Sequence, residues 1–341
     1  MSSNGRYVVF ASDATNLAPG DTNGKRDIFI RDTVARTTKR VTKGVSGQTN
    51  GHSFSPKVSD DGRYVAFLSD ATNLVPRDTN RVTDAFRADL RTGTVVRVSV
   101  GSQGAQANAV TSRVVMSANG ASIAFASEAT NLAAGDTNGR SDIFLRDLAT
   151  ASPRRLSPNG ATDPSISPDG KWVGFLGWDG HAFGWNRATN ARSVVCRDEP
   201  YDGYGEEYCT LVAASNAGVS SQSWGFYGCC TYYYGIEVTA KPTNLSFDYG
   251  WSPFYDYVPT GILDVTTFGA TALVRDGEQE GGSTSRVELV LMDKTGILAN
   301  LGTDSNSAAL AGNGASVVME QNQQIVQWKR ATGSSAVVSV R

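Results

Sequence analysis

Short apolar runs alternate with polar turns along the whole chain. Residues 6–10, 27–31 and 37–41 are examples of runs rich in β-branched and aromatic residues, and Gly, Asn, Asp and Pro bound them. Their periodicity is that of strands. Because no segment shows the period of an amphipathic helix, the sequence predicts an all-β protein.

The pattern returns as whole units. GRYVVFASDATNLAPGDTNGKRDIFIRD from Gly5, GRYVAFLSDATNLVPRDTNRVTDAFRAD from Gly62 and GASIAFASEATNLAAGDTNGRSDIFLRD from Gly120 align without a gap. Weaker copies begin at Gly170, near Gly218, around Gly269 and at Gly314. A further run ahead of the glycine, such as 53–59, completes four strands per unit.

Four-stranded units repeated around an axis are typical of a β-propeller. The sequence therefore predicts a seven-bladed β-propeller of four-stranded antiparallel blades, forming one domain over residues 1–341. Regular blades are expected at about 1–176 and 306–341. Irregular blades rich in aromatic residues and cysteine are expected at about 177–305. Residues 1–4 are all that remains to supply an inner strand to the first blade.

A family resemblance rests on these motifs. The repeats carry three motifs: S-P/D-D-G-[RK]-[YW]-[VI]-[AG]-F, D-I-F-[IL]-R-D-L and R-[VL]-[TS]. Together they resemble the TolB-type (WD-like) propeller repeat, in the branch with an ATNL…DTNG insertion. The resemblance covers residues 3–176 well, 306–341 tolerably and 180–300 poorly. It implies the propeller fold and little about chemistry, since propellers host binding proteins and enzymes alike.

Composition narrows the classes of partner. The formal net charge is -2 and the pI is near 5.8, without a basic stripe, which disfavours nucleic acid and anionic membranes. No apolar run approaches the roughly 18 residues that span a bilayer. The first residues lack the apolar stretch of a signal peptide. We expect that a secretion signal was removed, and that the protein is a secreted or periplasmic monomer.

The repeated DTNG loops are the first chemical candidate. Asp at the first and seventh positions and Asn at the third present hard oxygens, which suits structural calcium. The predicted ligands are Asp21, Asn23, Asp27, Asp78, Asn80, Asp84, Asp136, Asn138 and Asp142. Asn16, Asn73 and Asn131, or carbonyls of the Ala-Thr-Asn-Leu turn, are expected to add ligands. The alternative is turn chemistry, in which these side chains bond to their own backbone.

An acid also stands at the twelfth position of each loop, as in a helix-loop-helix calcium site. These acids are Asp32, Asp89 and Asp147. The intervening residues should be an extended strand that rises about 3.3 Å per residue. The twelfth position is therefore predicted to lie too far from the seventh to share its ion.

The second candidate is the segment where the repeat breaks, because most aromatic residues of the chain lie there. The predicted ligand-binding residues are Trp178, Tyr201, Tyr204, Tyr232, Tyr233, Tyr234 and Trp251. Exposed Trp and Tyr suit sugars or a protein partner, and glycine spacing favours loops. The alternative is that larger side chains fill a widened core, as expected for Trp172 and Phe175.

Catalysis at the same surface is a competing hypothesis. Acids between 198 and 207, among them Glu206, lie near these aromatics, as a glycoside hydrolase would require. His181 takes the place of a DTNG loop, and with a tyrosine such as Tyr204 it offers the proton-transfer pair of a polysaccharide lyase. A solvated acidic loop is the plainer interpretation. No G-x-S-x-G or phosphate-loop motif occurs.

All cysteines lie in the irregular segment, at Cys196, Cys209, Cys229 and Cys230. Cysteines confined to one insertion indicate disulfides and an oxidising compartment. A Cys196–Cys209 bond with a vicinal bridge is one pairing, and the adjacency of the last two favours crossed pairs instead. A zinc site is a lesser alternative. Together these features predict a binding module that recognises a carbohydrate or protein partner.

Overall fold

The structure is a computed structural model. It describes residues 1–150, 152–196, 199–201, 205–216, 218–227, 231–240, 243–248, 257–265, 272–280, 283–293, 296–303, 308–310, 316–321, 324–329, 331 and 334–339.

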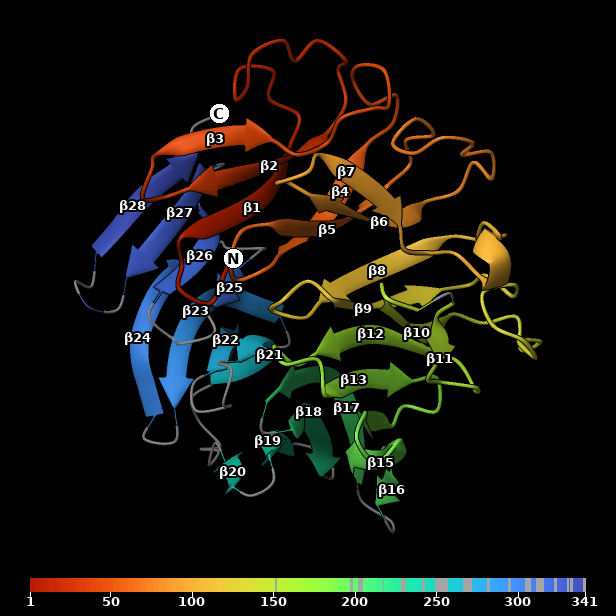
Figure 1. The fold of residues 1–341 in the computed structure, drawn as a ribbon. Coiled ribbons are helices and arrows are strands. Elements are labelled where there is room, and N and C mark those ends of the chain that lie inside the picture. Colours follow the sequence, from red (N-terminus) through yellow and green to blue (C-terminus); the bar gives the residue numbers. More distant parts are fainter. Residues whose placement is uncertain are drawn as a thin grey trace. The chain divides into compact units, whose positions relative to one another are not determined.

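The strands form antiparallel sheets in which neighbours along the chain are neighbours in the sheet (Figure 1). The first sheet holds β1 (Tyr7–Ser12), β2 (Asp27–Asp32) and β3 (Thr37–Arg40). The second holds β4 (Ser53–Val58), β5 (Tyr64–Ser69), β6 (Asp84–Asp89) and β7 (Thr94–Arg97). The third holds β8 (Thr111–Met116), β9 (Ser122–Ser127), β10 (Asp142–Asp147) and β11 (Arg154–Arg155).

The later sheets follow the same order. The fourth holds β12 (Ala161–Ile166), β13 (Trp172–Gly177), β14 (Ala182–Asn186) and β15 (Ala191–Cys196). The fifth holds β16 (Glu199–Tyr201), β17 (Gly205–Ser215), β18 (Gly218–Tyr227), β19 (Thr231–Ala240) and β20 (Thr243–Asp248). Two further sheets hold β21 (Tyr257–Val265), β22 (Ala272–Glu280), β23 (Ser283–Asp293) and β24 (Gly296–Thr303), and β25 (Ala308–Leu310), β26 (Ser316–Gln321), β27 (Gln324–Lys329) and β28 (Ser334–Ser339).

The chain divides into two compact units. One comprises Met1–Pro164, Pro168–Gly170 and Val338–Arg341, and the other comprises Ser165–Ser167 and Lys171–Val337. The first three sheets belong to the first unit. The prediction of one domain stays a prediction.

The all-β class and the antiparallel four-stranded sheets are confirmed. Uniform four-stranded blades are not, because the first sheet has three strands and the fifth has five. In the first sheet, residues 1–4 form a turn in place of an inner strand, and the backbone N–H of Ser2 donates to the carbonyl of Tyr7 at 2.9 Å.

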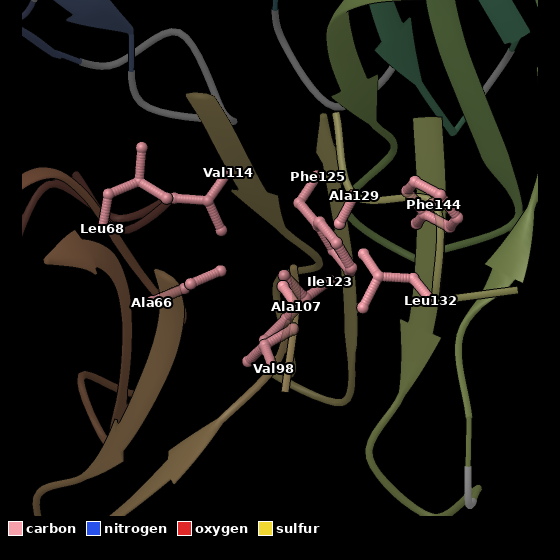
Figure 2. Packing of buried hydrophobic residues seen from close by; sticks show 11 residues of the cluster. Ala66, Leu68, Val98, Ala107, Val114, Ile123, Phe125, Ala129, Leu132 and Phe144 are labelled. Atoms are coloured by element: carbon pink, nitrogen blue, oxygen red, sulfur yellow. The ribbon is translucent and has the colours of Figure 1, made fainter. Parts of the chain in front are cut away.

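Apolar residues on alternate strand positions fill the layers between successive sheets of the first unit. One buried cluster joins the first and second sheets through residues such as Ile28, Val65 and Phe86. A second cluster joins the second and third sheets, where Leu68 lies across from Phe125 and its neighbours (Figure 2). Strand alternation places every second side chain on the same face, and this explains the two separate clusters.

A pair of phenylalanines recurs on two adjacent strands of each of the first four sheets. The pairs are directly opposite in register, and their ring centroids lie 5.5–5.9 Å apart: Phe10–Phe29, Phe67–Phe86, Phe125–Phe144 and Phe175–Phe183. Phe175 is fully buried, as expected for a core position.

The acids at the twelfth loop position accept hydrogen bonds that join neighbouring strands. Arg6 donates to Asp32, with Nη2 2.8 Å from Oδ2, and Arg63 donates to Asp89 at 2.7 Å. In the third sheet Ser122 Oγ takes this role and donates to Asp147 at 2.7 Å. As the strand geometry predicted, these carboxylates serve the strand pair and not the loop.

The ion pair between Arg6 and Asp32 predicts that the stability of the protein depends on pH. The hydrogen bond from Arg6, followed by that from the backbone of Ala35, lowers the pKa of Asp32 from 3.8 to about 2. Because the folded pKa lies below the unfolded one, the stabilisation is complete about one pH unit above 3.8 and is lost as the pH falls through 3.8 and then about 2. In urea unfolding at a series of pH values, the stability difference between the wild type and Asp32→Asn should be constant above about pH 5 and shrink below pH 4. A difference that does not change with pH would contradict the role given to Arg6.

Candidate functional site

Each DTNG loop is closed by an arginine at or beside the end of the sheet's outer strand. In the second sheet, Arg97 Nη2 lies 2.8 Å from Asp78 Oδ2, and Arg97 Nε lies 3.5 Å from Asp84 Oδ2. These three side chains are only 6%, 3% and 1% exposed. The loop therefore holds a buried carboxylate–guanidinium–carboxylate triad.

The other two loops repeat this triad. Arg40 Nη1 lies 3.2 Å from Asp21 Oδ1 and 3.5 Å from Asp27 Oδ2. Arg155 Nη2 lies 3.0 Å from Asp136 Oδ1 and 2.6 Å from Asp142 Oδ2. The arrangement is thus a property of the repeat.

Short polar side chains complete the triad. In the second sheet Asn80 Nδ2 donates to Asp84 Oδ2 at 2.9 Å, and Ser99 Oγ donates to Asp84 Oδ1 at 2.5 Å. The equivalent donors are Asn23 and Thr42 in the first sheet and Asn138 and Ser157 in the third. The arginine and the Ser/Thr residue belong to the R-[VL]-[TS] motif, and its recurrence together with DTN is the sequence signal for this contact.

Burial makes these carboxylates dependent on a nearby cation. Desolvation raises the pKa of Asp84, opposed by the hydrogen bonds from Ser99 and Asn80. Desolvation is also the largest cause that raises the pKa of Asp21, Asp78 and Asp136. A cation beside them offsets the cost of burying charge, and arginine supplies it.

This arrangement does not fit the calcium ion predicted from the sequence. The guanidinium lies beside both carboxylates, where the ion would bind. Asn23 Oδ1 accepts from the backbone N–H of Lys25 at 3.0 Å, as turn chemistry requires, and its Nδ2 faces the acid. Oδ1 of Asp21 accepts no hydrogen bond but lies at ion-pair distance from Arg40. Calcium needs six to eight oxygens, so we derive no role for it here.

The asparagines expected as extra ligands serve another purpose. Asn73 Nδ2 donates to the carbonyl of Gln48 at 2.8 Å, and Asn73 Oδ1 accepts from the backbone N–H of Asn50. Asn131 makes the equivalent bonds to Gln106 and Asn108. Asn16 is exposed. Both amides hold the connection that enters the next inner strand, and their Oδ1 atoms already accept hydrogen bonds.

The fourth sheet has a short turn in place of a DTNG loop. Residues 178–181 join β13 to β14, where the earlier sheets have residues 13–26, 70–83 and 128–141. The backbone N–H of Gly177 donates to the carbonyl of His181 at 2.8 Å, and that of Gly180 donates to Gly177 at 3.1 Å. Gly180 has a φ of +78°, which an L side chain rarely adopts. These bonds fix the turn.

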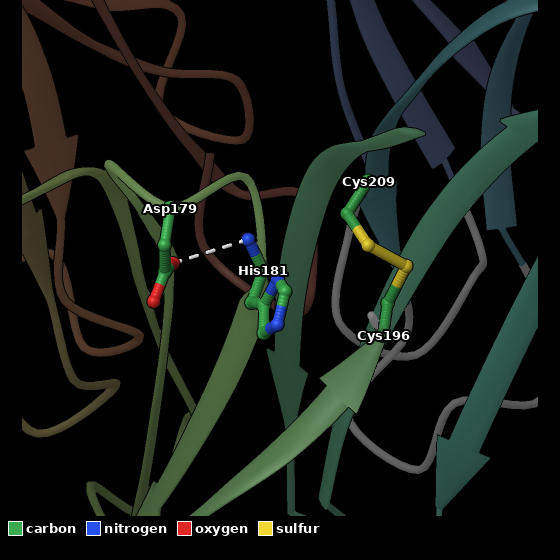
Figure 3. Close-up of a disulfide and its surroundings, with 4 residues drawn as sticks. All are labelled: Asp179, His181, Cys196 and Cys209. Carbon is green, nitrogen blue, oxygen red and sulfur yellow. Dashed lines mark hydrogen bonds between the residues drawn. A yellow bond between two sulfur atoms is a disulfide. The ribbon is translucent and has the colours of Figure 1, made fainter. Parts of the chain in front are cut away.

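Trp178 stands in this turn and is 57% exposed. His181 follows it, with its ring centroid 6.3 Å from that of Phe183, and Arg192 Cζ lies 4.6 Å from the Phe183 centroid. Asp179 Oδ1 accepts from the backbone N–H of His181 at 3.2 Å (Figure 3). The turn thus carries an exposed indole, an imidazole and a carboxylate, and the Arg192 guanidinium on β15 lies over Phe183, whose ring is also near the imidazole.

A disulfide between Cys196 and Cys209 lies at the base of this turn, with Cα atoms 6.0 Å apart (Figure 3). Both cysteines are buried with Ala182, which pairs with Cys196 across the sheet. The preference for crossed pairs is therefore wrong. Cys196 ends β15 and Cys209 lies in β17, and their packing in one apolar cluster brings the sulfurs together.

Several predicted site residues are not on loops. Tyr201 lies in β16, and Tyr232, Tyr233 and Tyr234 lie in β19, which pairs with β18. The prediction of loops is wrong for these four, because tyrosine has a high preference for strands. Tyr204, Trp251, Cys229 and Cys230 lie outside the described residues, as does the side chain of Glu206.

Within the described ranges, no group of three or more His, Cys, Asp or Glu side chains is placed to hold a metal ion. Among those same residues no helix is long and apolar enough to cross a membrane.

Comparison with solved structures identifies similar folds. An oligogalacturonate lyase from Vibrio parahaemolyticus matches with a TM-score of 0.62 and 13% identity, over 99% of this chain and 86% of that one. The β-propeller domain of the Trilobed protease from Pyrococcus furiosus matches with a TM-score of 0.55 and 10% identity, over 85% and 86%. A structure from a study of two prolyl endopeptidases matches with a TM-score of 0.60 and 13% identity, over 92% of this chain.

The chain spans 46% of the length of that prolyl endopeptidase structure. No protein family and no curated protein matches the sequence. At these identities the likeness concerns the fold alone, which is that of β-propeller domains.

Proposed function

We propose that the protein is a binding module built as a seven-bladed β-propeller of TolB-type repeats, and that it recognises a carbohydrate through the β13–β14 turn. The observation that carries this proposal is the exposed indole of Trp178 on a hydrogen-bonded turn. A flat apolar ring with a polar edge stacks on sugar rings. Because the turn is fixed, little conformational entropy is lost when a ligand binds.

Neighbouring groups support a polar ligand. Asp179 and Arg192 are exposed near the same turn, and His181 is partly exposed. Carboxylate, guanidinium and imidazole groups can bond to hydroxyls around an aromatic platform. The DTNG loops of the regular sheets, closed by buried triads, offer no comparable aromatic group.

The disulfide also supports a location. Disulfides persist in oxidising compartments, so we propose that the protein works in the periplasm or outside the cell.

A glycan array followed by calorimetry tests this function. Trp178→Ala should weaken binding of the best glycan by about tenfold or more, since a central aromatic contact commonly contributes that much. Val194→Ala removes a 38% exposed apolar residue from the same sheet and should leave binding unchanged. Equal binding by the wild type and Trp178→Ala would contradict the proposal. No binding to any glycan would favour a protein partner.

A polysaccharide lyase is the second candidate function. The similarity in fold to an oligogalacturonate lyase and the place of His181 in the same turn as Trp178 favour it. In this reaction the imidazole of His181 would act as a base on the sugar ring. Growth of the absorbance of unsaturated uronates, lost in His181→Ala, would support the lyase. Glycan binding without turnover supports the module.

A further inference from the structure

Two arginines take the place of apolar residues between the second and third sheets. Between the first and second sheets, Ile30 and Ala88 belong to one buried apolar cluster. The same two repeat positions, one sheet further along, hold Arg87 on β6 and Arg146 on β10. The layer between the second and third sheets therefore contains guanidinium groups where its predecessor is apolar.

Strand alternation places both side chains in this layer. Ala85 and Phe144 precede the two arginines by two residues, and both belong to the cluster between the second and third sheets. Residues two apart on a strand share a face. Arg87 also reaches across the layer, since its Nη1 donates to the carbonyl of Gly120 at 2.9 Å.

Not every N–H donor of Arg87 has a hydrogen-bond partner. Its Cζ lies 4.2 Å from the ring centroid of Tyr64, a favourable cation–π distance. Tyr64 is itself fixed against Gly120, where an added Cβ would come within 2.5 Å of the ring. Nε of Arg87 is buried and has no hydrogen-bond partner.

Arg146 is less well satisfied. The residue is 9% exposed, and its Nε and Nη1 are buried without a hydrogen-bond partner in the described part of the chain. Neither arginine has an ion pair among those residues. Asp89 is held by Arg63 at 2.7 Å, and Asp147 accepts from Ser122. Burial lowers the pKa of both arginines, which reflects the cost of the missing counter-charge.

We propose that this layer binds a small oxyanion, such as inorganic phosphate or sulfate, through Nε and Nη1 of Arg146 and Nε of Arg87. The Nε–Nη edge of a guanidinium matches two oxygens of a tetrahedral oxyanion. The anion would supply the counter-charge for which the described residues form no ion pair with either arginine. The proposed site shares no residue with the β13–β14 turn, so its failure leaves the proposed function untouched.

Calorimetric titration with sodium sulfate and with sodium phosphate, against sodium chloride at matched ionic strength, tests the site. The wild type should bind one oxyanion per chain, and its melting temperature should rise with saturation. Arg146→Met should weaken binding about tenfold or more, because two charge-assisted hydrogen bonds are removed. Arg31→Met is the matched control, since Arg31 holds the same repeat position in the first sheet and donates to Thr38. It should bind like the wild type.

A wild type without saturable oxyanion binding would overturn the proposal, and so would equal binding by the wild type and Arg146→Met. If Arg146→Met does not fold, Arg87→Met replaces it. It should weaken binding by a smaller factor, because it removes one hydrogen bond to the anion and not two. A crystal soaked in selenate should also show an anomalous peak beside Arg146. A peak at other arginines only would overturn the assignment.

Discussion

Arg97→Ala is expected to destabilise the protein by about 3–5 kcal/mol, because removal of one partner from a buried ion pair leaves an uncompensated charge. Asp78 and Asp84 are 3% and 1% exposed, and the arginine that lies beside both is 6% exposed. Without it, two buried carboxylates face each other in a medium of low dielectric constant. Repulsion and desolvation then act in the same direction.

Urea unfolding of the wild type and the variant measures this loss. Arg63→Ala is a suitable control, since Arg63 is 29% exposed and its pair with Asp89 is partly solvated. Its effect should be much smaller. Equal losses in the two variants would show that the loop triad has no special role.

Phe125→Ala is expected to cost about 3–5 kcal/mol, the range for a buried aromatic residue cut back to alanine. Phe125 is fully buried, belongs to the cluster between the second and third sheets, and stacks on Phe144 with ring centroids 5.5 Å apart. Its removal leaves a cavity in a layer that rigid strands cannot close. Differential scanning calorimetry would measure the loss.

Two variants bracket this effect. Phe125→Leu keeps most of the apolar volume and should cost less than Phe125→Ala. Val34→Ala changes a residue that is 72% exposed and should stay within about 0.5 kcal/mol of the wild type. A small loss for Phe125→Ala would mean that the layer between these sheets is not tightly packed.

The sheets could be predicted because their signal is local. Residues 64–69 and 84–89 repeat residues 7–12 and 27–32 of the first unit, and they form β5 and β6 with Phe67 opposite Phe86. Each repeat carries its own strands and turns, so knowledge of the tertiary structure was not needed. Where the repeat weakens, strand number varies, as the five-stranded sheet shows.

The loop chemistry could not be predicted from the loop alone. The two Asp residues and the Asn of the loop provide oxygen atoms. Either a metal ion or a donor side chain can bind such atoms. The arginine comes from a different strand, and only pairing of the outer strand with its neighbour brings Arg97 to Asp84. The available signal was joint recurrence, because R-[VL]-[TS] follows DTN in each regular repeat.

Trp178 illustrates what composition can show about a site. The loss of the DTNG loop and the appearance of an aromatic turn were visible in the sequence. The exposure of Trp178 could not be predicted from the sequence, since Trp185 of the same sheet is buried. The breakdown of the repeat predicts loops for Tyr232, Tyr233 and Tyr234, although strand pairing places them in β19.

The central claim is that the regular repeats close their loops with their own arginines, which leaves ligand recognition to the sector that breaks the repeat. Calorimetric titration of chelator-treated protein with calcium chloride tests this claim most directly. The account predicts no saturable binding and no rise in melting temperature. Saturable binding of calcium at the DTNG loops, abolished by Asp78→Asn together with its counterparts Asp21→Asn and Asp136→Asn, would contradict it.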